Sequence, residues 1–105
     1  MEDIRFFCSK KLKVEIVSHE MRMGCFTDSP IITMVANNRV LLDLSYKLWD
    51  LEKIKEKNQM LIMTLRKYPG TTTGIEVSID TIGNLFLHGV KMEHDELMTK
   101  LQEYT

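Results

Sequence analysis

The side chains of this sequence that could act as nucleophile and general base are its cysteines and histidines. The cysteines are Cys8 and Cys25, and the candidate bases are His19, His88 and His94. A catalytic Cys–His pair needs the two side chains in contact and a third group that orients the base. Both cysteines lie on the apolar faces of expected strands, where a free cysteine is usually unreactive packing. We therefore expect no catalytic residue among them.

A metal site is the second chemistry that the residue types allow. His88, His94 and Asp95 are close in sequence, and a strand end followed by a helix start would bring them together. Zinc sites need three or four such ligands, and no Cys-x-x-Cys or His-x-x-x-His pattern supports one. The segment GTTTG (70–74) lacks the glycine spacing and the lysine of phosphate-binding loops. We expect no metal, no cofactor and no enzymatic activity.

The charge is close to neutral overall but unevenly distributed. A formal net charge of −1 over 105 residues argues against a domain that binds phosphate backbones through its total charge. Residues 45–70 carry six Lys or Arg against three Asp or Glu, whereas residues 71–105 carry two against six. This length supports one core of modest size, so residues 1–105 are expected to form a single domain.

Nothing in the sequence indicates export or a membrane span. The N-terminus starts with acidic residues and has no apolar stretch of signal-peptide length. The longest apolar run, MLIMTL (60–65), is far shorter than the roughly 20 residues that cross a bilayer. We expect a cytoplasmic protein with reduced thiols and no membrane partner.

Residues 1–44 have the pattern of an antiparallel β-meander of four or five strands. The clearest strand has apolar residues at alternate positions, Leu12, Val14 and Ile16. Turns are expected at TDSP (27–30) and at Asn37-Asn38, because asparagine tolerates positive φ. The expected strands are 4–8, 12–17, 21–26, 31–36 and 39–44, the last with Val40, Leu42 and Leu44 facing the core.

From Ser45 the apolar period changes and favours one long central helix that ends at Pro69-Gly70. The stripe that carries this prediction consists of Leu48, Leu51, Asn58, Leu61, Ile62, Leu65 and Tyr68, with Ile54 at its edge. One alternative stays open. The segment KEKNQ (55–59) is polar throughout, and a break there would make MLIMTL a buried strand.

The C-terminal third is expected to form a hairpin and a final helix. Ile75, Val77 and Ile79 alternate in the first strand, and the segment 81–84 turns the chain. Asp95 is a candidate N-cap, and Leu97, Leu101 and Tyr104 form an apolar helical stripe. The expected fold class is therefore α+β, an antiparallel sheet with the long central helix and a terminal helix packed on it.

Two families share local features with this third of the chain. The pattern IDxxGNLFLxG before a helix that begins ELxxxL resembles the periplasmic domain of the ExbD/TolR proteins, which also carry a transmembrane helix with an essential aspartate. The segment LRKYPGTTTGIEVSIDTIGNLFLHGVKM resembles part of the double-wing domain of the middle-promoter activator of T-even phages, which would imply DNA contact through the sheet. Both likenesses concern one supersecondary unit.

The predicted function is that of a small, non-enzymatic, cytoplasmic binding or regulatory protein that works through a protein partner or through self-association as a homodimer. Eight methionines suit an adaptable binding surface, and the composition fits an AT-rich genome such as that of a phage, with a host or viral protein as target. An edge strand of the meander is one interface candidate. The other candidate interface residues are Met60, Met63, Met98, His88, Lys91, Glu93 and His94.

The alternative function is that of a nucleic-acid-binding transcriptional regulator. It would use the sheet and the basic central helix, and phosphate contacts would make its affinity fall steeply with salt. The candidate contacts are Lys10, Lys11, Lys13, Lys53 and Lys57.

Overall fold

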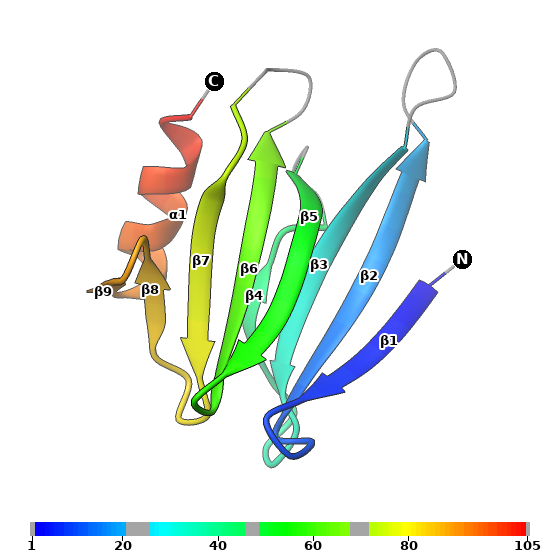
Figure 1. The fold of residues 1–105 in the computed structure, drawn as a ribbon, viewed down its shortest axis with the longest axis vertical. Coiled ribbons are helices and arrows are strands. Elements are labelled where there is room, and N and C mark those ends of the chain that lie inside the picture. The colour runs from blue at the N-terminus through cyan, green and yellow to red at the C-terminus, as the bar shows by residue number, and fades with distance from the viewer. Residues whose placement is uncertain (1, 21–25, 46–48, 68–71, 105) are drawn as a thin grey trace.

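The computed structural model describes residues 2–20, 26–45, 49–67 and 72–104, which form two antiparallel sheets and one helix (Figure 1). The first sheet has the order β1-β2-β3-β4, with β1 (Glu2–Phe7), β2 (Leu12–Glu20), β3 (Phe26–Met34) and β4 (Arg39–Asp43). The second has the order β5-β6-β7-β8-β9, with β5 (Trp49–Lys57), β6 (Met60–Lys67), β7 (Ile75–Asp80), β8 (Leu85–Leu87) and β9 (Val90–Met92). The helix α1 (His94–Gln102) follows β9.

The predicted α+β class is wrong because the long central helix does not exist. The residues assigned to it form the β5–β6 hairpin, in which Lys57 pairs with Met60. Asn58 and Gln59 join the strands with φ of 52° and 60°, and positive φ at both central residues is the geometry of a tight hairpin turn. The polar segment 55–59 is thus the end of β5 and its turn, as in the alternative that was not favoured.

The strand β2 of the first sheet has the alternating burial that its sequence predicts. Leu12, Val14 and Ile16 are buried, whereas Lys13 and Glu15 between them are partly exposed. The turn expected at 27–30 is wrong, because these residues lie inside β3 and pair with β2. Pro30 is tolerated there because it lies at the end of its pairing with β4. Its carbonyl accepts a hydrogen bond from the Leu44 N–H at 3.0 Å, just beyond the last residue of β4, so the N–H that proline lacks would point to a place where the ladder with β4 has already ended.

A turn is confirmed at Asn37-Asn38, but it spans residues 35–38, and of the two asparagines only Asn38 has positive φ, at 57°. In the strands that flank this turn, the register shifts between Ile32 and Thr33 of β3, and this changes which residues of β4 point inward. Leu41 and Leu42 are buried, and Val40, which was expected in the core, is 54% exposed. Of the expected strand 21–26, residues 21–25 lie outside the described part of the chain.

The β7–β8 hairpin follows the predicted pattern, with Ile75, Val77 and Ile79 buried. Its turn uses Gly83 at φ 95°, and a side chain there would meet Met34 and Leu41. The strand β9 was not predicted. The N-cap of α1 is Glu93, which makes no side-chain capping bond, so Asp95 lies in the first turn of the helix.

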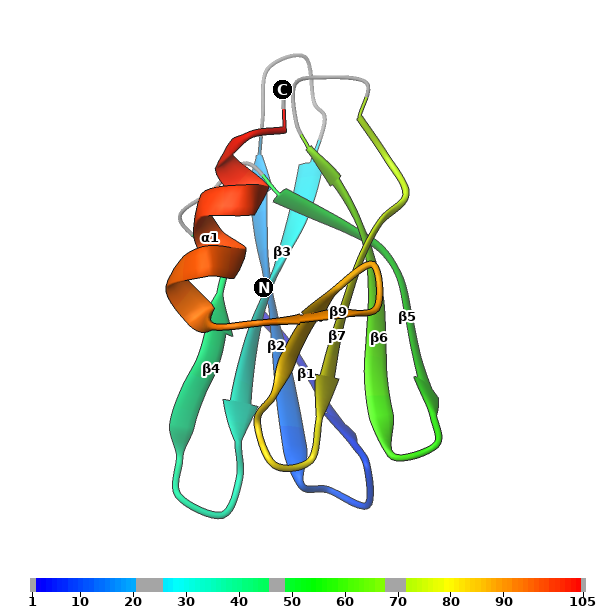
Figure 2. The same ribbon diagram turned by 90° about the vertical axis from the view of Figure 1, so that its left-hand side faces the viewer.

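Both sheets share one hydrophobic core. Its buried residues include Leu12, Val14 and Ile32 from the first sheet and Leu61, Met63, Val77 and Ile79 from the second. Leu97 and Leu101 of α1 join the same cluster, and the helix lies beside β8 and near β4, at one end of the sandwich (Figure 1 and Figure 2). The edge strand β1 lies farthest from α1 in Figure 1 and the edge strand β5 lies farthest from α1 in Figure 2, and no helix of the described residues covers either strand.

Candidate protein interface

At the end away from α1, two sets of hydrogen bonds hold β5 against the first sheet. Near the start of β5, Asp28 N–H donates to Asp50 Oδ1 at 2.9 Å, and the Ser29 hydroxyl donates to the Trp49 carbonyl at 2.6 Å. At the other end, Cys8 N–H donates to Glu56 Oε1 at 2.6 Å. The strands of the two sheets are not paired in one ladder, so side chains fix the distance between them at both ends.

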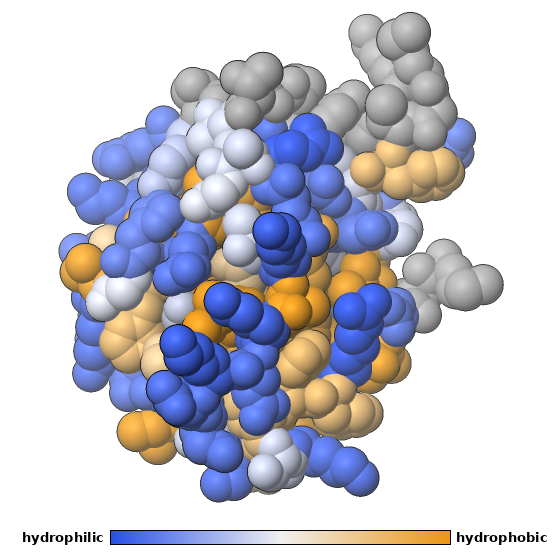
Figure 3. All heavy atoms as spheres, in the orientation of Figure 1, coloured by the Kyte–Doolittle hydropathy of each residue, from blue (hydrophilic) through white to orange (hydrophobic). Residues whose placement is uncertain are grey.

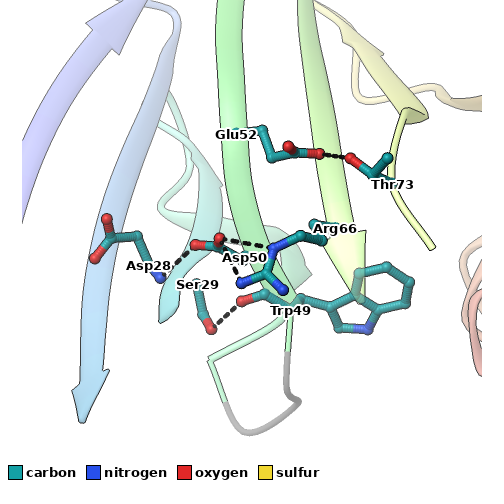
Figure 4. A network of polar contacts seen from close by, with 7 residues as sticks. All are labelled: Asp28, Ser29, Trp49, Asp50, Glu52, Arg66 and Thr73. Carbon is teal, nitrogen blue, oxygen red and sulfur yellow. Dashed lines mark hydrogen bonds and ion pairs between the residues drawn. The ribbon is translucent and has the colours of Figure 1, made fainter. Parts of the chain in front are cut away.

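Asp50 is the centre of the first set of bonds (Figure 4). One of its oxygens accepts the backbone N–H of β3, and the other lies 3.2 Å from Arg66 Nη2 of β6. The carboxylate therefore connects three strands from both sheets. Nearby, the Thr73 hydroxyl donates to Glu52, and Lys67 Nζ lies 4.9 Å from the centre of the Trp49 ring, within the range of a cation–π contact.

A groove of about 480 Å³ lies between β5 and the first sheet. We call it the edge groove, and it is lined by Arg5, Ile16, Asp28, Leu51, Glu52, Lys53, Ile54 and Lys55. Ile16 is 7% exposed, and Leu51 and Ile54 are half-buried, so the floor is apolar and the rim is charged. Figure 3 shows hydrophobic atoms in the middle of this face with hydrophilic side chains around them.

The edge strand β1 borders this groove. Among the described strands it pairs with β2 alone, so one side of its backbone carries N–H and C=O groups that face outward. Arg5 lies on the groove face, whereas Ile4 and Phe6 point to the other face and are 50% and 51% exposed. The backbone edge and these two side chains are therefore accessible to another strand.

The interface residues predicted from sequence lie in several places. Met63 is fully buried, Met60 is half-buried in β6, and Met98 is half-buried in α1 against the core. His88 is exposed in the β8–β9 turn at φ 49°. The residues Lys91, Glu93 and His94 do come together, since they line a second cleft of about 380 Å³ with Arg39 and Asn84.

The lysines proposed for nucleic acid lie on both sheets. Lys10 and Lys11 are exposed in the β1–β2 turn, and Lys13 pairs with Glu15 at 3.3 Å. Lys53 and Lys57 are exposed on β5. The bond between Cys8 and Glu56 brings the β1–β2 turn to the end of β5, so the turn with Lys10 and Lys11 lies near the end of β5 that carries Lys57.

The thiol of Cys8 is buried and unreactive. Its side chain is 0% exposed, and burial, with a smaller contribution from the Glu56 carboxylate, raises the pKa of its thiol. A protonated thiol is a poor nucleophile. Cys25 lies outside the described residues. Within the described ranges, no cluster of three or more His, Cys, Asp or Glu side chains is arranged to hold a metal ion.

Sequence reasoning missed Asp50, Arg66 and the pair Ile4 and Phe6 as site residues. The alternation in IRFF indicates that Ile4 and Phe6 share a face, which is the one local signal for them. Asp50 and Arg66 have no such signal, because their roles depend on the hairpin that the helical pattern concealed.

No family model, curated protein or solved structure matches this chain. In the part of the chain that the structure describes, no helix has the length and apolar character needed to cross a membrane.

Proposed function

We propose that this chain is a small, non-enzymatic binding protein that acts through protein–protein contact, with β1 and the edge groove as the contact surface. The observation that carries the proposal is an edge strand whose outer side pairs with none of the other described strands, with two half-exposed apolar side chains beside a groove with an apolar floor. An extended segment that adds to a sheet edge gains main-chain hydrogen bonds, and pockets beside the edge select its side chains.

The other edges of the two sheets support this choice. Natural proteins block open edges with bulges, lysines, short strands or covering elements. The strand β5 has a register shift between Leu51 and Lys53 and carries three lysines, and β9 has three residues. The strand β4 has a register shift against β3 and lies near α1. In contrast, β1 pairs with β2 in unbroken register from Glu2 to Phe7.

The test is capture of a binding partner by immobilised chain. We expect wild type to retain a protein, either a different one or further copies of itself, and we expect the double variant Ile4→Lys/Phe6→Lys to lose it. The matched control is Ile82→Lys, which changes an apolar residue that is 78% exposed in the β7–β8 turn. Equal capture by the double variant and wild type would overturn the assignment of β1, provided that circular dichroism shows both folded.

A second candidate function, nucleic-acid binding, is favoured by one observation. The Cys8–Glu56 bond brings Lys10 and Lys11 to the end of β5 that carries Lys57. A gel shift at several salt concentrations tests it, because each phosphate contact steepens the salt dependence. This candidate is supported if the chain binds nucleic acid, if the variant Lys10→Glu/Lys57→Glu does not, and if the slope of log affinity against log salt concentration corresponds to several phosphate contacts. The absence of a gel shift at low salt removes it.

A further inference from the structure

We propose that the segment that pairs with β1 is β1 of a second copy, antiparallel and centred on Ile4, so that two four-stranded sheets become one. This inference rests on the proposed function, since it names the partner of the same surface. The argument comes from the register that a symmetric pair of these strands must adopt.

Two copies related by a two-fold axis perpendicular to the sheet pair their edge strands antiparallel. Directly opposite residues in an antiparallel pair point to the same face. The core-facing surfaces of the two sheets lie on the same side of the joined sheet only if each core-facing residue of one β1 is opposite a core-facing residue of the other. Within β1 (Glu2–Phe7), a centre at Ile4 or at Arg5 pairs five residues of each strand, whereas a centre at Asp3 or at Phe6 pairs only three.

Charge complementarity and the number of paired residues together select one of these centres. A centre at Asp3 places two aspartates opposite each other, and a centre at Arg5 places two arginines opposite each other. A centre at Ile4 instead places Asp3 opposite Arg5 of the second copy, twice over. Like charges directly opposite destabilise a strand pair and opposite charges stabilise it, so of the two centres that pair five residues only Ile4 makes the strand complementary to itself. A centre at Phe6 brings no like charges together, but it pairs only three residues and joins no opposite charges.

The two charged side chains are available for such contacts. Asp3 Oδ2 and Arg5 Nη2 lie 2.9 Å apart within one chain, and their side chains are 53% and 51% exposed. They are therefore on the same face and can exchange partners with a second copy. The exchange replaces two intrachain pairs with two interchain pairs, so no charge is left unpaired.

The exposed apolar side chains of β1 also come together in the pairing. Ile4 meets Ile4 of the second copy, and Phe6 lies diagonal to it across the seam. Both side chains are half-exposed in one chain, and the dimer removes part of that surface from water. A contact of one six-residue strand is small, so the dimer is expected to be weak and to depend on protein concentration.

Charge reversal tests the register directly, by sedimentation equilibrium over a range of concentrations at low salt. Asp3→Arg places arginine opposite arginine in the proposed register, and Arg5→Asp places aspartate opposite aspartate. We expect wild type to dimerise and each single variant to weaken dimerisation at least tenfold. An equimolar mixture of the two variants restores complementarity at both positions and should form heterodimers. The double variant Asp3→Arg/Arg5→Asp should dimerise as wild type does.

The control is Glu96→Arg, which changes the charge at an exposed position of α1 and should leave dimerisation unchanged. A monomeric wild type at every concentration, or a mixture of single variants that stays monomeric, would overturn the self-pairing. If wild type is monomeric but captures a different protein, and the variant Ile4→Lys/Phe6→Lys does not capture it, the proposed function stands and this inference alone falls. If wild type neither dimerises nor captures a protein, both fall.

Discussion

At the scale of single residues, one carboxylate has an unusually large role in this small protein. Asp50 accepts a backbone N–H from β3 and contacts the guanidinium of Arg66 in β6. Its side chain is 19% exposed, so water screens these contacts less than it screens the other ion pairs. Because the sheets share no ladder, the relative position of β3 and β5 depends on this residue more than on backbone pairing.

Replacement of Asp50 should therefore cost more than replacement of an ordinary surface carboxylate. We expect Asp50→Ala to lower the free energy of unfolding by about 1–3 kcal/mol, since it leaves a partly buried N–H unsatisfied. The control Glu15→Ala removes the pair with Lys13 and should cost less than about 1 kcal/mol. Urea denaturation measures both, and equal losses would contradict this role of Asp50.

The buried thiol of Cys8 makes a separate prediction about pH. Its pKa is raised above the ordinary 9.0 by burial, so the folded protein holds the proton longer than the unfolded chain does. The contribution of this thiol to the free energy of unfolding is fully present below about pH 9. It falls as the pH rises from there towards the folded pKa, by about 1.4 kcal/mol per pH unit. In Cys8→Ala this loss is absent, so the stability difference between wild type and variant should narrow above about pH 9. A constant difference would contradict it.

At the scale of elements, the sequence predicts best where alternation is strict and the partner strand is near. In β2, the polar residues Lys13 and Glu15 separate the buried apolar ones, and in β7 Glu76 and Ser78 do the same. Such strict alternation is typical of a strand and not of a helix. The turns at Asn37-Asn38 and at Gly83 were found because positive φ restricts the residue type.

The β5–β6 hairpin was missed because its apolar residues fit two periods. Leu51, Leu61 and Leu65 lie close to one helical stripe, yet they also alternate when Asn58 and Gln59 form a two-residue turn. The strand β3 was cut short because Asp28 and Ser29 are typical of turns, and their bonds to β5 are contacts that no local pattern contains. Edge position was equally invisible, since it depends on the order of strands in the sheet.

The strand geometry of β6 gives a direct test. In a helix, Met60 and Met63 would lie on the same face, whereas in β6 Met63 is fully buried and Met60 is half-buried on the other face. We expect Met63→Ala to cost about 2–5 kcal/mol of unfolding free energy and Met60→Ala about 1 kcal/mol or less. Chemical denaturation of both variants measures the difference, and similar losses would argue against the strand.

At the scale of the whole molecule, one core holds two sheets that have no common ladder. Residues of β2, β6 and β7 belong to the same buried cluster as Leu97 and Leu101 of α1. The helix thus closes the core at one end, while the other end has the edge groove and β1. The proposed contact surface lies at the end that the helix does not cover, and its occupation would not require the core to open.

If the core is shared, both sheets should unfold together. Hydrogen exchange at the Val14 amide of β2 and the Val77 amide of β7 should give the same free energy, since both strands lie inside their sheets. Leu97→Ala should lower both by the same amount, about 2–5 kcal/mol, although α1 contacts β8 of the second sheet. The control Lys100→Ala changes an exposed residue of the same helix and should shift neither. A loss at Val77 without a loss at Val14 would mean that the sheets are stabilised independently, and the single-domain expectation would fail.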